Sequence, residues 1–253
     1  MSDFYDKEFY QGQRDGSSRS AMKVIPYIIK FIQPASVLDI GCGVGTWLSV
    51  FKNDFNVNDI SGIDGDYVDK RLLQIPINDF NPYNLEKVYF PGRKFDLAIS
   101  LEVGEHIEEK YSDNLVQSLT NASDFIVFSA ALPGQDGTNH INEQFPEYWA
   151  KKFLDKGYIC IDCVRKEIWD FSEVEIWYRQ NILIYIKKNI YDEKYKNLME
   201  SYAIKTDSEF LTRIHPELLA YFKGKFYQTK SLVGFLKFHL SPLKKFIFRE
   251  KKK

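Results

Sequence analysis

The chain has 253 residues and a net charge of −1; 44% of its residues are hydrophobic and 16% are aromatic. These proportions allow a substantial core and exclude a largely disordered chain. No apolar run approaches the ~18 residues that a membrane span needs, and the acidic segment at residues 1–10 is unlike a signal peptide.

The cysteine content bears on the compartment. Cys42, Cys160 and Cys163 are too few, and odd in number, for a disulfide framework, which favours a reducing compartment and, by default, the cytoplasm. Cys160 and Cys163 form a C-x-x-C pair, but no second pair follows and both lie in a predicted buried strand. We therefore expect no zinc there.

The charge is unevenly distributed along the chain. Residues 221–253 contain ten basic residues and one acidic residue, interleaved with aromatic and aliphatic ones, so the remainder is acidic. In one interpretation the apolar residues of this tail pack on the body or on a second copy of the chain. In the other, the tail lies on the inner face of the membrane, where its lysines are attracted to anionic lipid. An acidic body argues against a nucleic-acid substrate.

Hydrophobic periodicity predicts helices that alternate with strands. The predicted strands are short apolar runs at residues 36–40, 59–63, 95–101, 124–130, 158–166 and 179–186. The predicted helices are residues 18–32, broken or restarted at Pro26, then 46–52, 67–74, a segment through Ile107, Tyr111, Leu115 and Leu119, and a segment from Pro146 to Gly157 with Trp149, Phe153 and Leu154 on one face. This order predicts an α/β fold with a doubly wound, mostly parallel sheet and an antiparallel edge hairpin.

The most informative motif is a glycine-rich turn at residues 37–45, Val-Leu-Asp-Ile-Gly-Cys-Gly-Val-Gly. Three glycines after a strand let the backbone turn sharply and approach a ligand, and the helix predicted to begin at Thr46 would present its N-terminus to that ligand. The spacing G-x-G-x-G, with Asp39 two residues before the first glycine, differs from the dinucleotide fingerprint G-x-G-x-x-G.

This turn resembles the first motif of class I S-adenosylmethionine-dependent methyltransferases, and the resemblance extends over residues 10–187. Asp64 lies where that family binds the ribose hydroxyls, and Asp79 where it contacts adenine, with Phe80 beside the base. Residues 100–107, Ser-Leu-Glu-Val-Gly-Glu-His-Ile, resemble the family's E-V-x-E-H-I segment, which occurs in small-molecule and glycan methyltransferases.

The resemblance implies a Rossmann-like, seven-stranded methyltransferase domain at residues 1–188, with residues 1–20 as a candidate lid, followed by a helical, basic extension at residues 189–253. The implied cofactor is S-adenosyl-L-methionine. The residues implied to bind it are Asp39, Gly41, Cys42, Gly43, Gly45, Thr46, Asp64, Gly65, Asp79, Phe80, Leu101 and Glu102. The candidate acceptor-binding residues are Tyr10, His140, Asn142, Tyr178 and Arg179.

His106 is the candidate general base, with Glu105 beside it, because it follows a central strand at the edge where open sheets place their active crevice. A helix cap or a packing residue is the alternative. The polar loop at residues 134–143 follows the next strand and includes the Asn-His-Ile-Asn segment that contains His140 and Asn142. A cluster of Glu105, His106, Asp136 and His140 is conceivable, but no spacing demands a metal and we expect none.

The sequence thus favours an O-methyltransferase for a hydroxylated or phosphate-bearing small molecule, such as a sugar or sugar-nucleotide precursor of bacterial capsular polysaccharide. One alternative is a lipid-linked or quinone-like substrate at the membrane surface. Another is a non-catalytic, cofactor-binding partner subunit, against which the intact glycine turn, Asp64 and His106 argue. A homodimer is compatible with the sequence.

Overall fold

The computed structural model describes residues 7–199 and 211–221, with side chains at residues 15–197 and 211–221. Contacts divide the chain into two units, Met1–Arg213 and Ile214–Lys253. In the second unit the described part is residues 214–221, which include a short helix at 216–221. The basic tail at residues 222–253, and with it the membrane and packing interpretations, lies outside the described residues.

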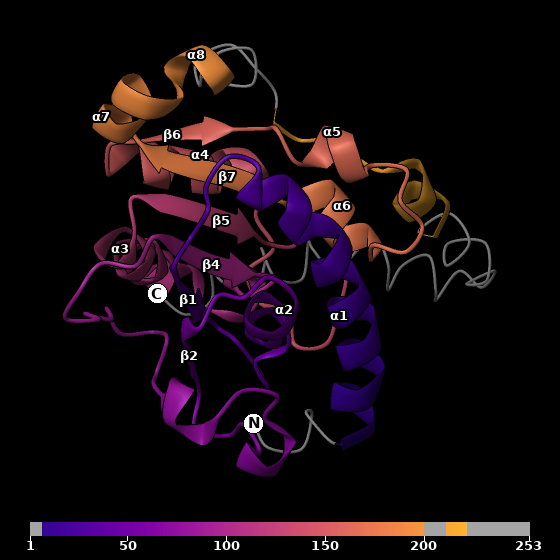
Figure 1. Ribbon diagram of the computed structural model, residues 1–253. Helices are drawn as coiled ribbons and strands as arrows, with labels where there is room; N and C mark the ends of the chain where they lie inside the picture. Colours follow the sequence, from indigo (N-terminus) through magenta and orange to yellow (C-terminus); the bar gives the residue numbers. More distant parts are fainter. Residues whose placement is uncertain (1–6, 200–210, 222–253) are drawn as a thin grey trace, which may run out of the picture. The chain divides into compact units, whose positions relative to one another are not determined.

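The first unit is built on a seven-stranded sheet (Figure 1). Its strands are β1 (Ser36–Ile40), β2 (Asp59–Asp64), β3 (Phe80–Pro82), β4 (Leu97–Leu101), β5 (Phe125–Ser129), β6 (Tyr158–Ile161) and β7 (Leu183–Lys187). They lie in the order β3-β2-β1-β4-β5-β7-β6, and β7 runs antiparallel to both of its neighbours. The predicted fold class is confirmed. The last two strands pair at the edge as expected, with β7 inserted between β5 and β6.

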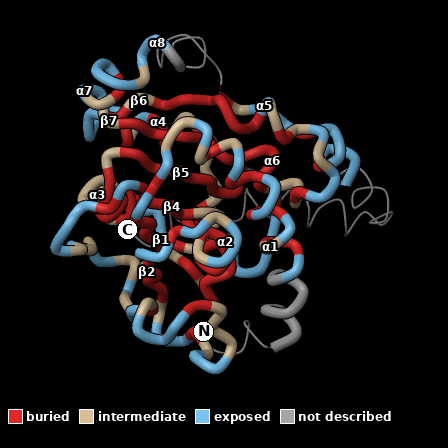
Figure 2. Tube along the Cα trace, in the orientation of Figure 1, coloured by how far each residue is buried: buried red, intermediate tan, exposed pale blue. Residues whose placement is uncertain are grey.

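Helices cover both faces of this sheet, as the alternating pattern predicted. One face packs against α1 (Lys7–Ile29), α2 (Thr46–Asp54), α5 (Arg165–Ile168) and α6 (Ile176–Asn181), and the other against α3 (Ser112–Ala122) and α4 (Pro146–Asp155). Successive strand residues serve opposite faces, because Val37 packs in the first cluster and Leu38 in the second. The central strands β1, β4, β5 and β7 are therefore buried along nearly their whole length (Figure 2), whereas the edge strand β3 is exposed after Phe80.

Several predicted elements differ from the structure. Residues 67–74 form no α-helix but a 3₁₀ turn at Lys70–Leu72, where the Asp69 carboxylate accepts the Arg71 N–H and favours a local turn. The helix expected through Ile107 begins at Ser112, because two 3₁₀ turns precede it. Leu154 is 42% exposed and does not share the buried face of α4. Helix α1 continues past Pro26 to Ile29.

The segment between β6 and β7 is also more helical than predicted. Strand β6 ends at Ile161, and α5 and α6 occupy parts of the ranges expected to be strand. The fully buried Arg165 explains the early end, because it donates to the Asp162 carboxylate and to the carbonyls of Gln180 and Leu211. After β7 the described chain continues through α7 (Lys188–Ile190), a π-helical turn at Tyr191–Tyr195 and α8 (Lys196–Met199).

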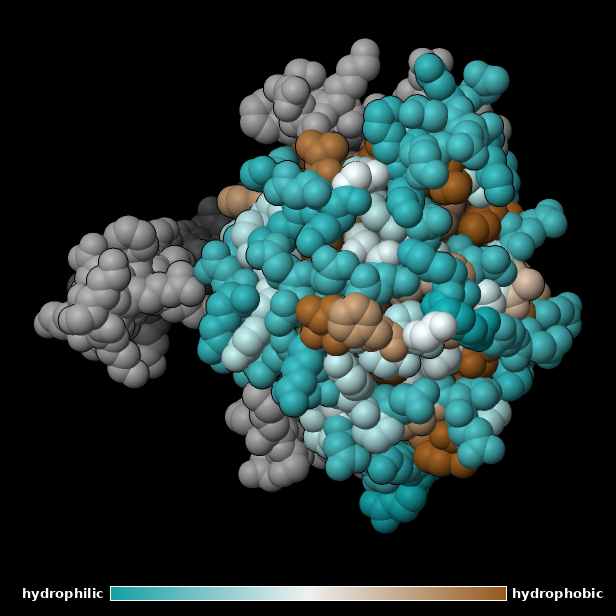
Figure 3. Space-filling model, turned by 90° about the vertical axis from the view of Figure 1, so that its left-hand side faces the viewer, coloured by the Kyte–Doolittle hydropathy of each residue, from teal (hydrophilic) through white to brown (hydrophobic). Residues whose placement is uncertain are grey.

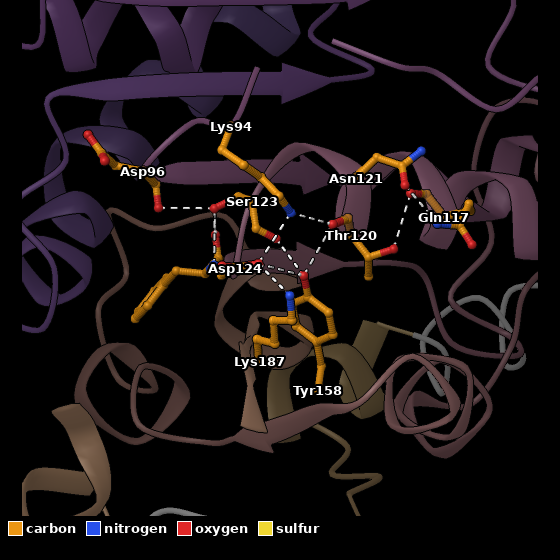
Figure 4. A network of polar contacts seen from close by, with 10 residues as sticks. Lys94, Asp96, Gln117, Thr120, Asn121, Ser123, Asp124, Tyr158 and Lys187 are labelled. Atoms are coloured by element: carbon orange, nitrogen blue, oxygen red, sulfur yellow. Dashed lines mark hydrogen bonds and ion pairs between the residues drawn. The ribbon is translucent and has the colours of Figure 1, made fainter. Parts of the chain in front are cut away.

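The edge of the sheet where β4 and β5 begin is closed by a polar network (Figure 4). Ser123 Oγ donates to the Asp96 carbonyl at 3.0 Å and accepts the Phe125 N–H at 3.0 Å. Lys94 Nζ donates to the Thr120 carbonyl at 2.8 Å, and the Tyr158 hydroxyl to the Ser123 carbonyl at 2.7 Å. Donors and acceptors at this edge thus satisfy one another.

The face shown in Figure 3 is mainly hydrophilic, with small and separate hydrophobic groups on the part that grey atoms do not cover. No helix among residues 7–199 and 216–221 is long and apolar enough to cross a membrane.

Candidate active site at the carboxyl edge of the sheet

The glycine-rich turn is tied to β2 and shaped by positive φ angles. Gly41 and Cys42 donate their N–H groups to the Ile63 carbonyl at 2.8 and 3.1 Å. The φ angles of Gly41, Gly43 and Gly45 are +87°, +53° and +81°, a region that side chains disfavour. A Cβ on Gly43 would meet nothing within 4 Å, so the backbone at Gly43 faces open space. This is the cradle that a closely approaching ligand requires.

Asp64 links the end of β2 to this turn. Its carboxylate accepts the Gly43 N–H at 2.7 Å, the Gly65 N–H at 2.6 Å and the Tyr67 hydroxyl at 2.7 Å. Burial raises the pKa of Asp64, and these three hydrogen bonds oppose the increase. Asp39, at the other side of the turn, has its pKa raised well above the usual value by burial and then by the charge of Asp64.

A single cavity of about 750 Å³ runs along the carboxyl ends of the central strands. Its lining includes eleven of the predicted site residues, namely Asp39, Gly41, Cys42, Gly43, Thr46, Asp64, Gly65, Leu101, Glu102, His106 and Tyr178. The Tyr178 hydroxyl lies 3.4 Å from Trp47 Nε1 and 3.2 Å from Ser17 Oγ, which fixes it in the wall. Its pKa is raised to about 12 by burial.

The structure does not bring Asp79 and Phe80 to this cavity. Asp79 forms an ion pair with Lys52 at 3.0 Å, and Phe80 is buried in the core. The reason is that β3 begins at Phe80, whereas the cavity lies at the carboxyl ends of the strands, where Pro82 pairs with Asp64. The residues that line the cavity there are Pro82, Tyr83, Asn84 and Leu85. They replace Asp79 and Phe80 as candidates for the adenine side.

Glu102, which lines the cavity near His106, is held by both its backbone and its side chain. It follows β4 in a left-handed conformation with φ of +58°, which is unusual for a residue with a side chain. Its carboxylate accepts Gln135 Nε2 at 3.0 Å and Asn181 Nδ2 at 3.2 Å. Glu102 itself lines the cavity, and these two buried amides fix the position of its carboxylate.

Glu105 and His106 follow in the 3₁₀ turn Gly104–His106. Glu105 is 1% exposed and lies behind the cavity wall. His106 reaches the cavity, and its ring lies 5.0 Å from that of His140 between centroids. The pKa of His106 is lowered to about 4, first by burial and then by the charge of His140, so its ring is neutral at pH 7.

The remaining predicted residues have other surroundings. Asn142 is buried and donates to the Gly104 carbonyl and to Ser112 Oγ, so it holds the Glu105 turn in place. Arg179 is buried and donates to the Trp169 carbonyl. Gly45 precedes α2 as its N-cap and is not among the residues that line the cavity, and a Cβ on it would meet the Ile75 side chain. Tyr10 lies in α1, and its side chain is outside the described residues.

Sequence reasoning missed the residues that hold the acceptor side together. Gln135 and Asn181 orient Glu102, and Glu143 accepts from His140 Nδ1 at 3.0 Å and from the backbone of Gly134 and Asp136. Gln135 and Glu143 lie in the polar loop that the sequence marked. Nothing in the sequence pointed to Asn181, which α6 supplies from a distant segment.

Comparison with known proteins agrees with this geometry. A family model described as a methyltransferase domain matches residues 10–161. The chain therefore belongs to that family, and the prediction of an S-adenosylmethionine-dependent methyltransferase is confirmed. No curated protein matches it.

Solved structures show the same fold. An O-methyltransferase family protein from Burkholderia thailandensis has a TM-score of 0.54 and 14% identity over 72% of this chain and 60% of its own. A putative O-methyltransferase from Nostoc punctiforme has a TM-score of 0.53 and 15% identity over 71% and 59%. Human N-acetylserotonin methyltransferase, solved with S-adenosylmethionine, has a TM-score of 0.51 and 14% identity over 71% and 55%. The chain thus spans less than two thirds of each.

Proposed function

We propose that this chain is an O-methyltransferase whose acceptor is a neutral, hydroxylated small molecule of the carbohydrate type, such as a precursor of bacterial surface polysaccharide. The observation that carries the proposal is the single cavity that joins the glycine turn to Glu102 and His106. Its volume of about 750 Å³ lies in the range of small-molecule sites, which supports a cofactor together with a small acceptor.

The charge of the cavity favours a neutral acceptor over a phosphate-bearing one. Five acidic residues line it, namely Asp39, Asp64, Asp66, Glu86 and Glu102. Among the described residues that line it, none is Lys or Arg, the side chains that usually bind phosphate. An anionic acceptor would therefore meet repulsion, whereas hydroxyl groups can donate hydrogen bonds to these carboxylates.

Bound S-adenosylmethionine supplies an electrophilic methyl group, whose carbon bonds to the acceptor oxygen while the C–S electron pair stays on sulfur. The chain's contribution is alignment, which can supply about 7–11 kcal/mol. The glycine turn and Asp64 hold one reactant, and the wall around Tyr178 and His106 faces the other. Neutral His106 can accept the acceptor proton or position the hydroxyl.

The test is methyl transfer from a donor with a deuterated methyl group, analysed by mass spectrometry. Neutral glycosides and polyols form one arm, and phosphorylated sugars, sugar nucleotides and an oligonucleotide form the others. We expect a labelled product in the neutral arm, with the label on oxygen. Transfer to phosphorylated acceptors or to the oligonucleotide alone, or to nitrogen, would contradict the proposal. His106→Ala should lower turnover by roughly 100-fold and leave cofactor affinity unchanged.

A further inference from the structure

Three potential metal ligands converge behind the acceptor side of the cavity. One ligand atom from each of Glu105, His106 and His140 lies within 4.8 Å of the others. His140 Nε2 is 4.0 Å from Glu105 Oε1, too far for a hydrogen bond. Two ligand atoms that each lie about 2.0–2.2 Å from a common cation are separated by roughly 3–4 Å. The spacing therefore fits a cation between them better than a direct contact.

The Glu105 carboxyl group gives independent support, because it is buried and its oxygens have no side-chain hydrogen-bond partner among the described residues. Glu105 is 1% exposed. Burial, and then the charge of Glu102, raise its pKa well above the usual value, and the backbone N–H groups of Glu105 and Ala131 oppose the increase by hydrogen bonding. His106 Nδ1 is likewise buried, with no side-chain partner in the described part of the chain. A buried carboxylate is costly unless it is paired or binds a metal.

The surroundings orient His140 in the way that metal sites do. Its Nδ1 lies 3.0 Å from Glu143 Oε1, so an N–H donated there leaves the Nε2 lone pair toward Glu105. Glu143 is itself held by the N–H groups of Gly134 and Asp136. Glu102 adds a second negative charge close enough to act on Glu105. Asp136, the fourth residue considered from the sequence, is exposed.

We propose that Glu105, His106 and His140 bind one divalent transition-metal cation. Because His106 lines the cavity, one coordination position of the cation would be open toward the cavity. The mixed carboxylate and imidazole set suits Mn²⁺, Fe²⁺, Co²⁺ or Zn²⁺. This replaces the expectation of a metal-free site. No fixed spacing in the sequence indicates this site, because His140 reaches Glu105 from a separate loop after β5. Among the described residues this is the one such cluster, and the Cys160–Cys163 pair forms none.

The catalytic role of this metal site rests on the proposed function, because the cation would act on the hydroxyl group that is methylated. A cation at this point would lower the pKa of a hydroxyl that enters from the cavity and would hold its oxygen. His106 would then act on the acceptor through the cation. The acceptor proton would leave to bulk water or to a buffer base, and the methyl carbon would bond to the acceptor oxygen as above.

The experiment is a titration of the metal-free full chain with Mn²⁺, in which free Mn²⁺ is measured by electron paramagnetic resonance. We expect one equivalent to bind. Glu105→Gln and His140→Ala should weaken binding at least 10-fold, and Glu143→Gln should weaken it about 10-fold through His140. Glu109→Gln, an exposed carboxylate four residues from Glu105, is the matched control and should bind as the wild type.

Thermal unfolding separates a ligand role from a structural one. Mn²⁺ should raise the melting temperature of the wild type and leave that of Glu105→Gln unchanged. Without metal, Glu105→Gln should be at least as stable as the wild type, because it removes a buried carboxyl group whose charged form is disfavoured by burial. A less stable Glu105→Gln together with no effect of Mn²⁺ on the wild type would overturn the proposal. If Glu105→Gln does not fold, the effect of Mn²⁺ on the melting temperature is measured for His140→Ala instead.

Activity then distinguishes the two proposals. Chelation should abolish transfer to the neutral acceptor and Mn²⁺ should restore it, with cofactor affinity unchanged. Full transfer by the chelated chain would overturn the metal site and keep the proposed function. Stoichiometric Mn²⁺ binding without transfer to any hydroxyl would keep the metal site and overturn the proposed function.

Discussion

The two edges of one sheet differ in how their polar groups are satisfied. At the amino edge, where β4 and β5 begin, Ser123, Lys94 and Tyr158 donate to the backbone carbonyls of Asp96, Thr120 and Ser123, respectively (Figure 4). At the carboxyl edge, the Glu105 carboxylate oxygens and His106 Nδ1 are buried and have no side-chain hydrogen-bond partner among the described residues. Unpaired buried groups cost stability, and they are retained where a ligand completes them. The comparison predicts that changes at the carboxyl edge alter binding, whereas changes at the amino edge alter stability.

The largest effect should follow from Asp64→Ala at the carboxyl edge. A charged hydrogen bond contributes about 1.5–3 kcal/mol, so the loss of two to the ribose hydroxyls should weaken S-adenosylhomocysteine binding by roughly 100-fold or more. Calorimetry measures this, and Asp54→Asn, an exposed carboxylate outside the cavity lining, is the control. Unchanged affinity of Asp64→Ala for S-adenosylhomocysteine would contradict the assignment of Asp64 to the ribose hydroxyls.

A matched pair of glycine substitutions sharpens the comparison within the carboxyl edge. Gly41 and Gly43 both have positive φ, but a Cβ on Gly41 would overlap the Val103 side chain, whereas one on Gly43 meets open space. Gly41→Ala should therefore lower the free energy of unfolding by about 2–4 kcal/mol, and Gly43→Ala by about 1 kcal/mol. Gly43→Ala should still weaken cofactor binding, since its Cβ would occupy the cradle. Equal losses of stability would contradict this account.

At the amino edge, Ser123→Ala should have the opposite profile. Ser123 is fully buried and bonds to Asp96 and Phe125, so removal of its hydroxyl should lower the free energy of unfolding by about 1–3 kcal/mol. Cofactor affinity, measured under conditions where the variant is folded, should equal that of the wild type. A loss of affinity larger than the loss of stability would show that the two edges are not independent.

The smallest effect concerns the pH dependence of cofactor binding. Burial raises the pKa of Asp64, so its charged form is lost at a higher pH than that of an ordinary aspartate, which titrates near 3.9. As the pH falls through this raised pKa, the carboxylate becomes protonated and accepts fewer hydrogen bonds, and affinity should decrease. Asp64→Asn should bind more weakly and show a flatter profile, whereas Asp39→Asn tests the contribution of the second carboxylate. If the affinity of the wild type does not change as the pH is lowered to 4, the assignment of Asp64 to cofactor binding is contradicted.

The sequence by itself determined the fold class, the glycine turn and the place of Asp64. These features are local, because a strand, a turn of fixed spacing and a helix follow one another in the chain, and period-2 and period-3.6 patterns report burial directly. The same logic failed where local signals compete. Residues 67–74 have helical spacing, yet the Asp69 side chain favours a turn.

Only the tertiary structure decided which polar residues meet. The insertion of β7 between β5 and β6 places α6, and with it Asn181, beside Glu102. The loop after β5 brings His140 to Glu105, and the short β3 places Pro82 and the residues after it, rather than Asp79, at the cavity. Such contacts join segments that are distant in sequence. They depend on strand order and loop path, for which a single sequence carries no periodic signal.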